Sequence, residues 1–318
     1  MTRQNQSASL GARGAEYIAK SAFFWALASL FGAASAHAQP APAVVELAAA
    51  RSALPSRPEC STVDCLLENA YQSDDKAKEL ALTLWSEAAD LAGVGPEETM
   101  DGGFRGQIRL VPQLPTRGYR KHLAWVLEGT RSIDRFFTRL YASLPAPSYR
   151  YRGLEFHFLR SLDKHRPSAY AVGWTIAYNV EGSLNLNANA VRETLFHELF
   201  HLNDAAHGEW SATHLRADYA AILHKCGAHP SVKCLAPYAP NDTMVRGGTF
   251  YAFQQNNGDT VQEYAAELAV RYFKEQSEML NAGKLSRKAF KCGPQENARA
   301  WQSVIGEFFS GRDLTPAC

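Results

Sequence analysis

The sequence lacks an excess of either charge. Of its 318 residues, 33 are Lys or Arg and 32 are Asp or Glu, which gives a formal net charge of +1. A protein dedicated to binding nucleic acid is usually clearly basic, so we expect no nucleic-acid partner. With 22 Gly, 15 Pro and 46% hydrophobic residues, the composition excludes a collagen-like, coiled-coil or wholly disordered chain.

Several other signals are also missing. The apolar run over residues 22–36 is shorter than the ~20 residues that span a bilayer. The chain has no internal repeat, no G-x-S-x-G sequence and no phosphate-binding loop. What remains is a globular chain long enough for one or two domains with a sizeable core.

The first 38 residues resemble a secretory signal peptide. Three basic residues precede the apolar run, which ends in a small-x-small sequence at residues 36–38. This arrangement predicts cleavage after Ala38, and the alternative is an uncleaved membrane anchor. We expect an exported protein, periplasmic or secreted, with no stable membrane insertion after cleavage.

The six cysteines favour the same compartment. An even number of cysteines in an exported chain indicates disulfides, whereas a zinc site made of cysteines needs Cys-x2-Cys clusters that are missing here. Six cysteines allow about 15 pairings, so the sequence cannot fix the connectivity. We predict that nearest neighbours pair: Cys60–Cys65, Cys226–Cys234 and Cys292–Cys318.

Patterning along the chain predicts an α+β fold. An Ala/Pro-rich arm covers residues 39–58, a helical region residues 59–150, and a third region, which contains the motif described next, residues 151–318. The domain is built around residues 105–310. Helical periodicity covers residues 74–92, 119–144, 191–203, 211–225, 260–280 and 295–309. Alternation predicts strands at residues 107–111, 154–159, 170–180 and, more briefly, 183–186.

One motif carries chemistry. Residues 197–201 read His197-Glu198-Leu199-Phe200-His201, which is H-E-x-x-H within a predicted helix. Residues four apart share a helix face, so both imidazoles can reach one metal ion. Glu198 lies beside that face, where a carboxylate can take a proton from water that Zn²⁺ has acidified to a pKa of ~7.

This motif resembles the active-site helix of the zincin metallopeptidases. The resemblance covers about a third of the chain and implies one Zn²⁺ ion and a peptide or protein substrate. It also implies a small, mostly antiparallel sheet packed on the active-site helix, with further helices before and after. In that superfamily an edge strand before the helix holds the extended substrate, and residues 183–187 occupy the corresponding place.

Two residues compete to be the third ligand. Glu263 begins an E-x-x-A-E sequence that resembles the second helix of the gluzincin branch, as in lethal-factor-like and neprilysin-like proteins, which implies that Glu263 binds zinc and Glu267 orients a histidine. Thr260 and Glu263 also match a capping box. His207 is spaced as in the metzincin pattern, but Asp204 replaces the glycine of that pattern.

The sequence indicates the roles of the remaining site residues less clearly. Asp204 falls on the metal face and is either a neighbour of the ligands or a polar residue of the last helical turn. Tyr251 is the first choice for stabilising an oxyanion, with His214 and Tyr219 also available. We therefore expect an exported zinc metallopeptidase, a hydrolase; the alternatives are an inactive zincin-fold binding protein and a zinc hydrolase acting on a non-peptide amide or ester.

Overall fold

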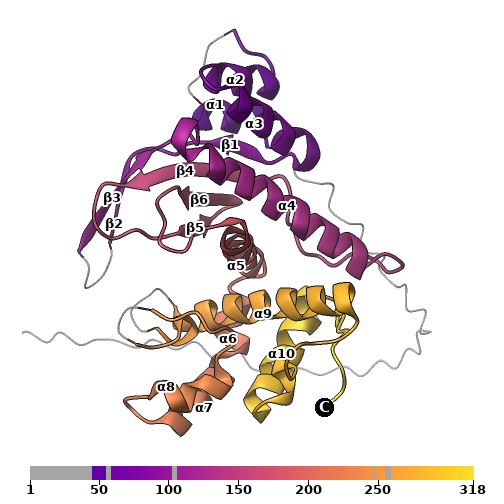
Figure 1. The fold of residues 1–318 in the computed structure, drawn as a ribbon. Helices are drawn as coiled ribbons and strands as arrows, with labels where there is room; N and C mark the ends of the chain where they lie inside the picture. Colours follow the sequence, from indigo (N-terminus) through magenta and orange to yellow (C-terminus); the bar gives the residue numbers. More distant parts are fainter. Residues whose placement is uncertain (1–44, 55–58, 102–105, 246–247, 255–258) are drawn as a thin grey trace, which may run out of the picture. The chain divides into compact units, whose positions relative to one another are not determined.

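A computed structural model describes residues 45–54, 59–101, 106–245, 248–254 and 259–318 (Figure 1). The predicted signal peptide lies outside these residues, as does part of the predicted arm. Within the described ranges, no helix is long and apolar enough to cross a membrane.

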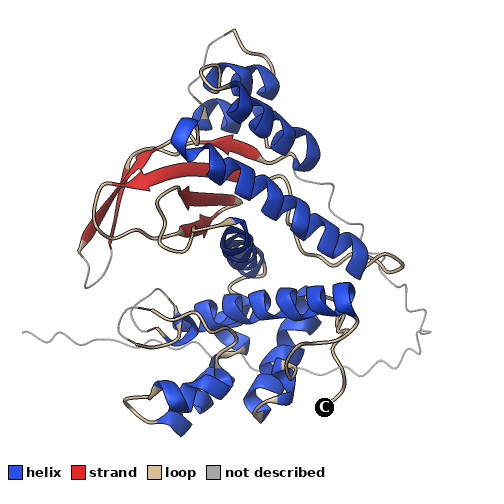
Figure 2. Cartoon of the chain, in the orientation of Figure 1, coloured by secondary structure: helices blue, strands red, loops and turns tan. Residues whose placement is uncertain are grey.

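The described chain is a mixed α+β structure (Figure 2), as the sequence predicts. Its helices are α1 (Leu47–Ala53), α2 (Val63–Ala70), α3 (Asp75–Ala88), α4 (Arg120–Leu140), α5 (Ala188–Ala206), α6 (Trp210–His214), α7 (Arg216–Cys226), α8 (Val232–Leu235), α9 (Thr260–Ala282) and α10 (Gln295–Phe308). Its strands are β1 (Leu91–Gly93), β2 (Glu98–Asp101), β3 (Gln107–Pro112), β4 (Glu155–Ser161), β5 (Ala169–Val172) and β6 (Thr175–Asn179).

The six strands form one sheet in the order β2-β3-β4-β6-β5, with β1 also paired to β4. β4 pairs in parallel with β1 and β6 and antiparallel with β3. The β2–β3 and β5–β6 pairs are antiparallel. The sheet is therefore mixed, and the expectation of a mostly antiparallel sheet holds only for three of its five pairings.

The strands from residues 170–180 differ from the prediction. A single alternating run was expected, but the chain turns at Gly173 and Trp174, which both have positive φ, and forms the β5–β6 hairpin. Alternation continues on both arms of a tight hairpin, so the pattern alone does not reveal the turn.

The short strand predicted at residues 183–186 is wrong, because this segment forms turns. Its conformation is fixed by Asn185, a buried residue whose side-chain amide donates to the carbonyl groups of Ser168 (2.8 Å) and Asn179 (2.9 Å). The edge strand beside α5 is instead β5.

The division of the chain into regions also differs from the prediction, as does one helix. Strands β1, β2 and β3 belong to residues 59–150, yet they join the same sheet as β4. Within the predicted arm, α1 is an ordered helix that buries Ala50 and Ala53, and the carbonyl of Ala53 accepts a hydrogen bond from Val94 at 2.6 Å. The predicted helix at residues 211–225 is divided at Leu215 into α6 and α7.

The predicted disulfides are confirmed as Cys60–Cys65, Cys226–Cys234 and Cys292–Cys318. The first closes the turn before α2, and the second connects the end of α7 to α8. The third attaches the C-terminal residue to the 3-10 turn Phe290–Cys292.

The site is positioned by α5, which packs against α4, α9 and β5. Its N-terminus is capped by Asn187, whose side chain accepts a hydrogen bond from the backbone N–H of Ala190. Apolar residues on several of its faces join the main hydrophobic core, among them Leu195, Phe196, Leu199 and Phe200. A helix buried among so many neighbours holds its polar side chains in fixed positions.

Candidate metal centre

A cleft of about 1500 Å³ opens beside α5 and is lined by residues of α5, α9, β5 and the loops between them. His197, Glu198 and His201 all line it. A long buried helix that presents two imidazoles and a carboxylate to one cleft places polar groups where a purely structural helix has apolar ones.

The two histidines meet as the i, i+4 spacing predicts. Their Nε2 atoms lie 3.1 Å apart, and the rings are in an edge-to-face arrangement with centroids 4.8 Å apart. Two imidazole lone pairs repel each other at this distance, so a proton or a cation must lie between them.

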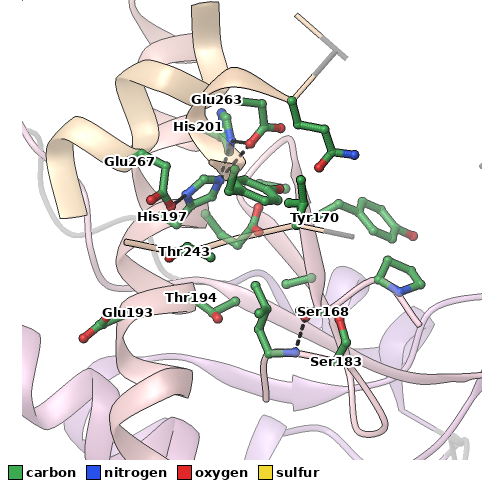
Figure 3. A pocket seen from close by; sticks show the side chains of 18 of the residues that line it. Ser168, Tyr170, Ser183, Glu193, Thr194, His197, His201, Thr243, Glu263 and Glu267 are labelled. Atoms are coloured by element: carbon green, nitrogen blue, oxygen red, sulfur yellow. Dashed lines mark hydrogen bonds and ion pairs between the residues drawn. The ribbon is translucent and has the colours of Figure 1, made fainter. Parts of the chain in front are cut away.

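Glu263 on α9 completes the group. Its Oε2 atom is 3.2 Å from His197 Nε2 and 3.8 Å from His201 Nε2 (Figure 3). Glu263 is available because Asp259 caps α9 instead, accepting a hydrogen bond from Val261 N–H at 2.8 Å. The capping-box alternative for Glu263 is therefore not the arrangement found.

The spacing of these three atoms fits a metal ion. Ligand atoms bound at 2.0–2.1 Å in a tetrahedron lie about 3.3 Å from one another. The separations here are 3.1, 3.2 and 3.8 Å. His197, His201 and Glu263 thus form a possible metal-binding triad with two nitrogen donors and one oxygen donor.

Behind the triad, Glu267 orients one of its histidines. Glu267 Oε1 lies 3.2 Å from His197 Nδ1, so the carboxylate accepts the Nδ1 proton and leaves Nε2 as the donor atom to a metal. Figure 3 shows Glu267 on the side of His197 away from His201. Glu263 and Glu267 are four residues apart on α9, so one helix face supplies both carboxylates.

Asn241 supports Glu267 in turn. Its side-chain amide donates to Glu267 Oε2 at 3.0 Å and to the Glu267 carbonyl at 2.8 Å, and the residue is buried. Sequence reasoning missed this role, because Asn241 lies 26 residues before Glu267 in a segment with no periodic pattern.

The pKa values of His197 and Glu263 depend mainly on burial and on the residues of the triad and Glu267. Burial lowers the pKa of His197, but its hydrogen bonds to Glu263 and Glu267 outweigh burial and raise that pKa well above the usual value. Burial raises the pKa of Glu263, but both histidines lower it far more. Without a metal, His197 thus forms ion pairs with Glu263 and Glu267, and a metal ion must displace the proton on Nε2 to bind there.

Glu198 is buried next to the triad and lines the cleft. Burial raises the pKa of its carboxyl group, while the nearby His197 and His201 oppose the rise. A carboxylate with an elevated pKa beside a metal site has the property needed to accept and return a proton.

Tyr251 also lines the cleft, at the start of a 3-10 turn. Its ring packs edge-to-face on His197, with centroids 5.6 Å apart. The loop is held by a hydrogen bond from Tyr251 N–H to the Thr243 carbonyl at 2.8 Å. The structure thus brings Tyr251 to the metal group.

The other sequence candidates lie elsewhere. His207 ends α5 and bonds through Nδ1 to Glu307 on α10 at 2.7 Å, so it is not part of the triad. The carboxylate of Asp204 is used by Ser211, accepting from its N–H at 2.8 Å and its hydroxyl at 2.6 Å. Asp204 therefore fixes the connection from α5 to α6.

The two alternative oxyanion donors are used structurally. His214 stacks on Trp210 with centroids 4.6 Å apart, and its Nδ1 bonds to the Trp210 carbonyl. Tyr219 is buried on α7 and stacks on Phe253.

Comparison with known proteins identifies no relative of this chain. No protein-family model, no curated protein and no solved structure matches this chain. The function therefore has to be argued from the site itself.

Proposed function

We propose that the protein is a zinc-dependent metallopeptidase with a zincin-like site. The observation that carries this proposal is the convergence of His197 Nε2, His201 Nε2 and a Glu263 oxygen at 3.1–3.8 Å. Two imidazoles and one carboxylate, with an open cleft beside them, are typical of catalytic zinc in hydrolases. The three disulfides agree with an exported protein, since disulfides persist in oxidising compartments.

His197, His201 and Glu263 would hold the ion. When bound, Zn²⁺ supplies Lewis-acid chemistry, polarising a carbonyl oxygen and acidifying water. Glu267 keeps His197 in the tautomer that binds metal through Nε2. Peptide hydrolysis also requires a group that removes a proton from water and delivers it to the leaving amine, and Glu198 lies in the cleft for that role.

The proton-transfer role of Glu198 follows from its surroundings. Its pKa is raised by burial, which makes the carboxylate a stronger base than an exposed glutamate. Tyr251 packs on His197 from the loop side of the cleft, where a phenol O–H can donate to the oxyanion that forms during hydrolysis.

The edge of the sheet supports a peptide as substrate. Among the described residues, β5 pairs only with β6, and it lines the cleft with Ala169, Tyr170 and Ala171. Asn179 N–H donates to the Ser168 carbonyl, so by alternation Ser168 and Tyr170 face β6, and Ala169 and Ala171 direct their backbone groups towards the cleft. An extended peptide can add to such an edge through main-chain hydrogen bonds.

Glu198→Gln tests the proposal. We expect the variant to bind zinc as the unchanged protein does and to lose at least about 100-fold in peptide hydrolysis, measured by mass spectrometry of a peptide-library digest. Hydrolysis by neither protein would indicate a binding protein without catalysis. Hydrolysis of an amide or ester library but of no peptide would indicate a different zinc hydrolase.

A further inference from the structure

Basic side chains line one end of the cleft and acidic side chains the other. Lys164 and Arg166, in the loop from β4 to β5, line one end together with His165. At the other end, the lining includes Glu209, which follows α5, and Asp259, which caps α9 and forms an ion pair with Arg216 at 3.1 Å.

The basic end lies next to the start of both β5 and α5. The Ser168 hydroxyl accepts a hydrogen bond from Leu184 N–H at 2.8 Å, which joins the residue before β5 to the turn before α5. Figure 3 shows Ser168 and Ser183 together on the side of the cleft away from His201. The cleft therefore runs along α5 from the basic loop, past His197 and His201, to Glu209.

The two basic residues of this loop differ in their partners. Asp163 faces the sheet and accepts from Arg109 N–H at 2.8 Å. Arg166 forms an ion pair with Glu181 at 3.6 Å, and Glu181 also accepts from the Tyr119 hydroxyl at 2.7 Å. Lys164 is exposed and forms no ion pair with any described residue.

On the cleft side, Glu193 is the acid of α5 nearest the basic loop. It lies 3.1 Å from Lys274 on α9, which offsets its charge. Lys164 is therefore the base of this loop that no described acid pairs with.

The direction of a bound peptide follows from β5. Antiparallel pairing is the more stable arrangement, and it places the C-terminal part of a peptide beside the start of β5, next to the basic loop. Its N-terminal part then lies towards Glu209 and Asp259.

We propose that the cleft selects peptides with a carboxylate on the C-terminal side of the cleaved bond, and that Lys164 and Arg166 bind this carboxylate. The proposal rests on the proposed peptidase function. Ala190 is seven positions before His197 on α5, a rise of about 10 Å, which an extended peptide covers in about three residues. The carboxylate belongs either to an Asp or Glu side chain about three residues after the cleaved bond or to the C-terminus of a short peptide that ends there.

Paired peptides provide the test. A peptide cleaved by the protein is made with Glu or Gln at the third position after the cleaved bond and an amidated C-terminus. A second pair, ending at that position, has a free or an amidated C-terminus. We expect kcat/KM to be about three- to tenfold higher for the anionic member of at least one pair, and the pair that responds identifies the source of the carboxylate.

Charge removal makes the test specific. Lys164→Gln combined with Arg166→Gln should abolish the preference, so that kcat/KM for the anionic and the neutral member of each pair becomes equal. Lys284→Gln combined with Lys288→Gln is the matched control, since both residues are exposed and outside the cleft, and it should retain the preference. Equal rates for anionic and neutral peptides, or a preference that survives the Lys164/Arg166 change, overturns the proposal.

A binding measurement separates this proposal from the peptidase function. Fluorescence anisotropy of the same peptides on the Glu198→Gln variant should give the same preference and should weaken with added salt. If no peptide is cleaved by the unchanged protein, the peptidase function fails. Anisotropy of a short library peptide with a free or an amidated C-terminus then decides whether the basic end binds carboxylates. Equal affinities for the paired peptides contradict the inference in that case as well.

Discussion

His197 Nδ1 lies 3.2 Å from Glu267 Oε1, so the carboxylate sets which nitrogen of His197 carries a proton. Glu263, on the same face of α9, is 3.2 Å from the other nitrogen of the ring. Two glutamates one turn apart therefore contact the two nitrogens of one imidazole. Glu263 belongs to the possible metal-binding triad, whereas Glu267 orients the ring.

Glu267→Gln should weaken zinc binding about 10- to 100-fold, because an amide holds the Nδ1 proton less strongly than a carboxylate. Competition with a chromogenic chelator measures the affinity. Glu79→Gln on the exposed surface of α3 is the control, and we expect its affinity to equal that of the unchanged protein. Equal affinities for the Glu267 and Glu79 variants would contradict the role of Glu267.

Replacing Asn241 should affect zinc through Glu267. Asn241→Ala removes the donor to Glu267 Oε2, whereas Asn241→Asp also adds a second negative charge beside that oxygen. We expect both variants to bind zinc more weakly, with the Asp variant the weaker of the two. The same chelator competition tests this order, and unchanged affinity in both variants would show that the Asn241 contact does not reach the metal.

The Glu263→Ala and His207→Ala variants should differ in zinc content. Glu263→Ala removes one of three ligand atoms, so the purified protein should hold less than about a tenth of the zinc of the unchanged protein after dialysis. His207→Ala should keep its zinc, because His207 is bonded to Glu307. Elemental analysis by mass spectrometry compares them, and zinc loss in the His207 variant alone would favour the metzincin-like arrangement.

Asp90 should make stability depend on pH. Burial raises the pKa of its carboxyl group to about 7, against hydrogen bonds that include one from Leu154 N–H. A buried carboxyl group with a raised pKa lowers the stability of the folded protein once the pH favours its ionised form. With respect to Asp90, the folded protein is therefore most stable below the unfolded pKa near 3.8, and it loses this stability as the pH rises to about 7. The Asp90→Asn variant should therefore gain stability over the unchanged protein by about 1.4 kcal/mol per pH unit in that window.

Urea unfolding at pH 4, 5.5, 7 and 8 measures this difference. It should grow from pH 4 to pH 7 and stay level above that. A difference that does not vary with pH would show that Asp90 is ionised in the folded protein throughout this range.

The longest elements were predictable because their patterns are local. The apolar stripes of α4, α5 and α9 repeat over several turns, and the H-E-x-x-H spacing itself requires the two histidines of α5 to share a face. Glu263 could be proposed because Glu267 follows it at the same spacing. Nearest-neighbour cysteines paired as predicted, since short loops between them keep the sulfur atoms close.

Other features depend on partners distant in sequence. β1 has three residues and is a strand only because it pairs with β4, more than 60 positions later. The contact between Asn241 and Glu267 likewise forms when the loop before α9 folds back on it. No local pattern encodes such pairings, and for the same reason the sequence does not reveal that β5, rather than residues 183–187, forms the edge strand beside α5.

Anomalous diffraction at the zinc edge from crystals of the zinc-loaded protein tests the central claim most directly. The account predicts one strong peak about 2.0–2.2 Å from His197 Nε2, His201 Nε2 and a Glu263 carboxylate oxygen. A peak bound elsewhere, a peak that lacks one of these three residues, or no peak in saturating zinc would contradict it.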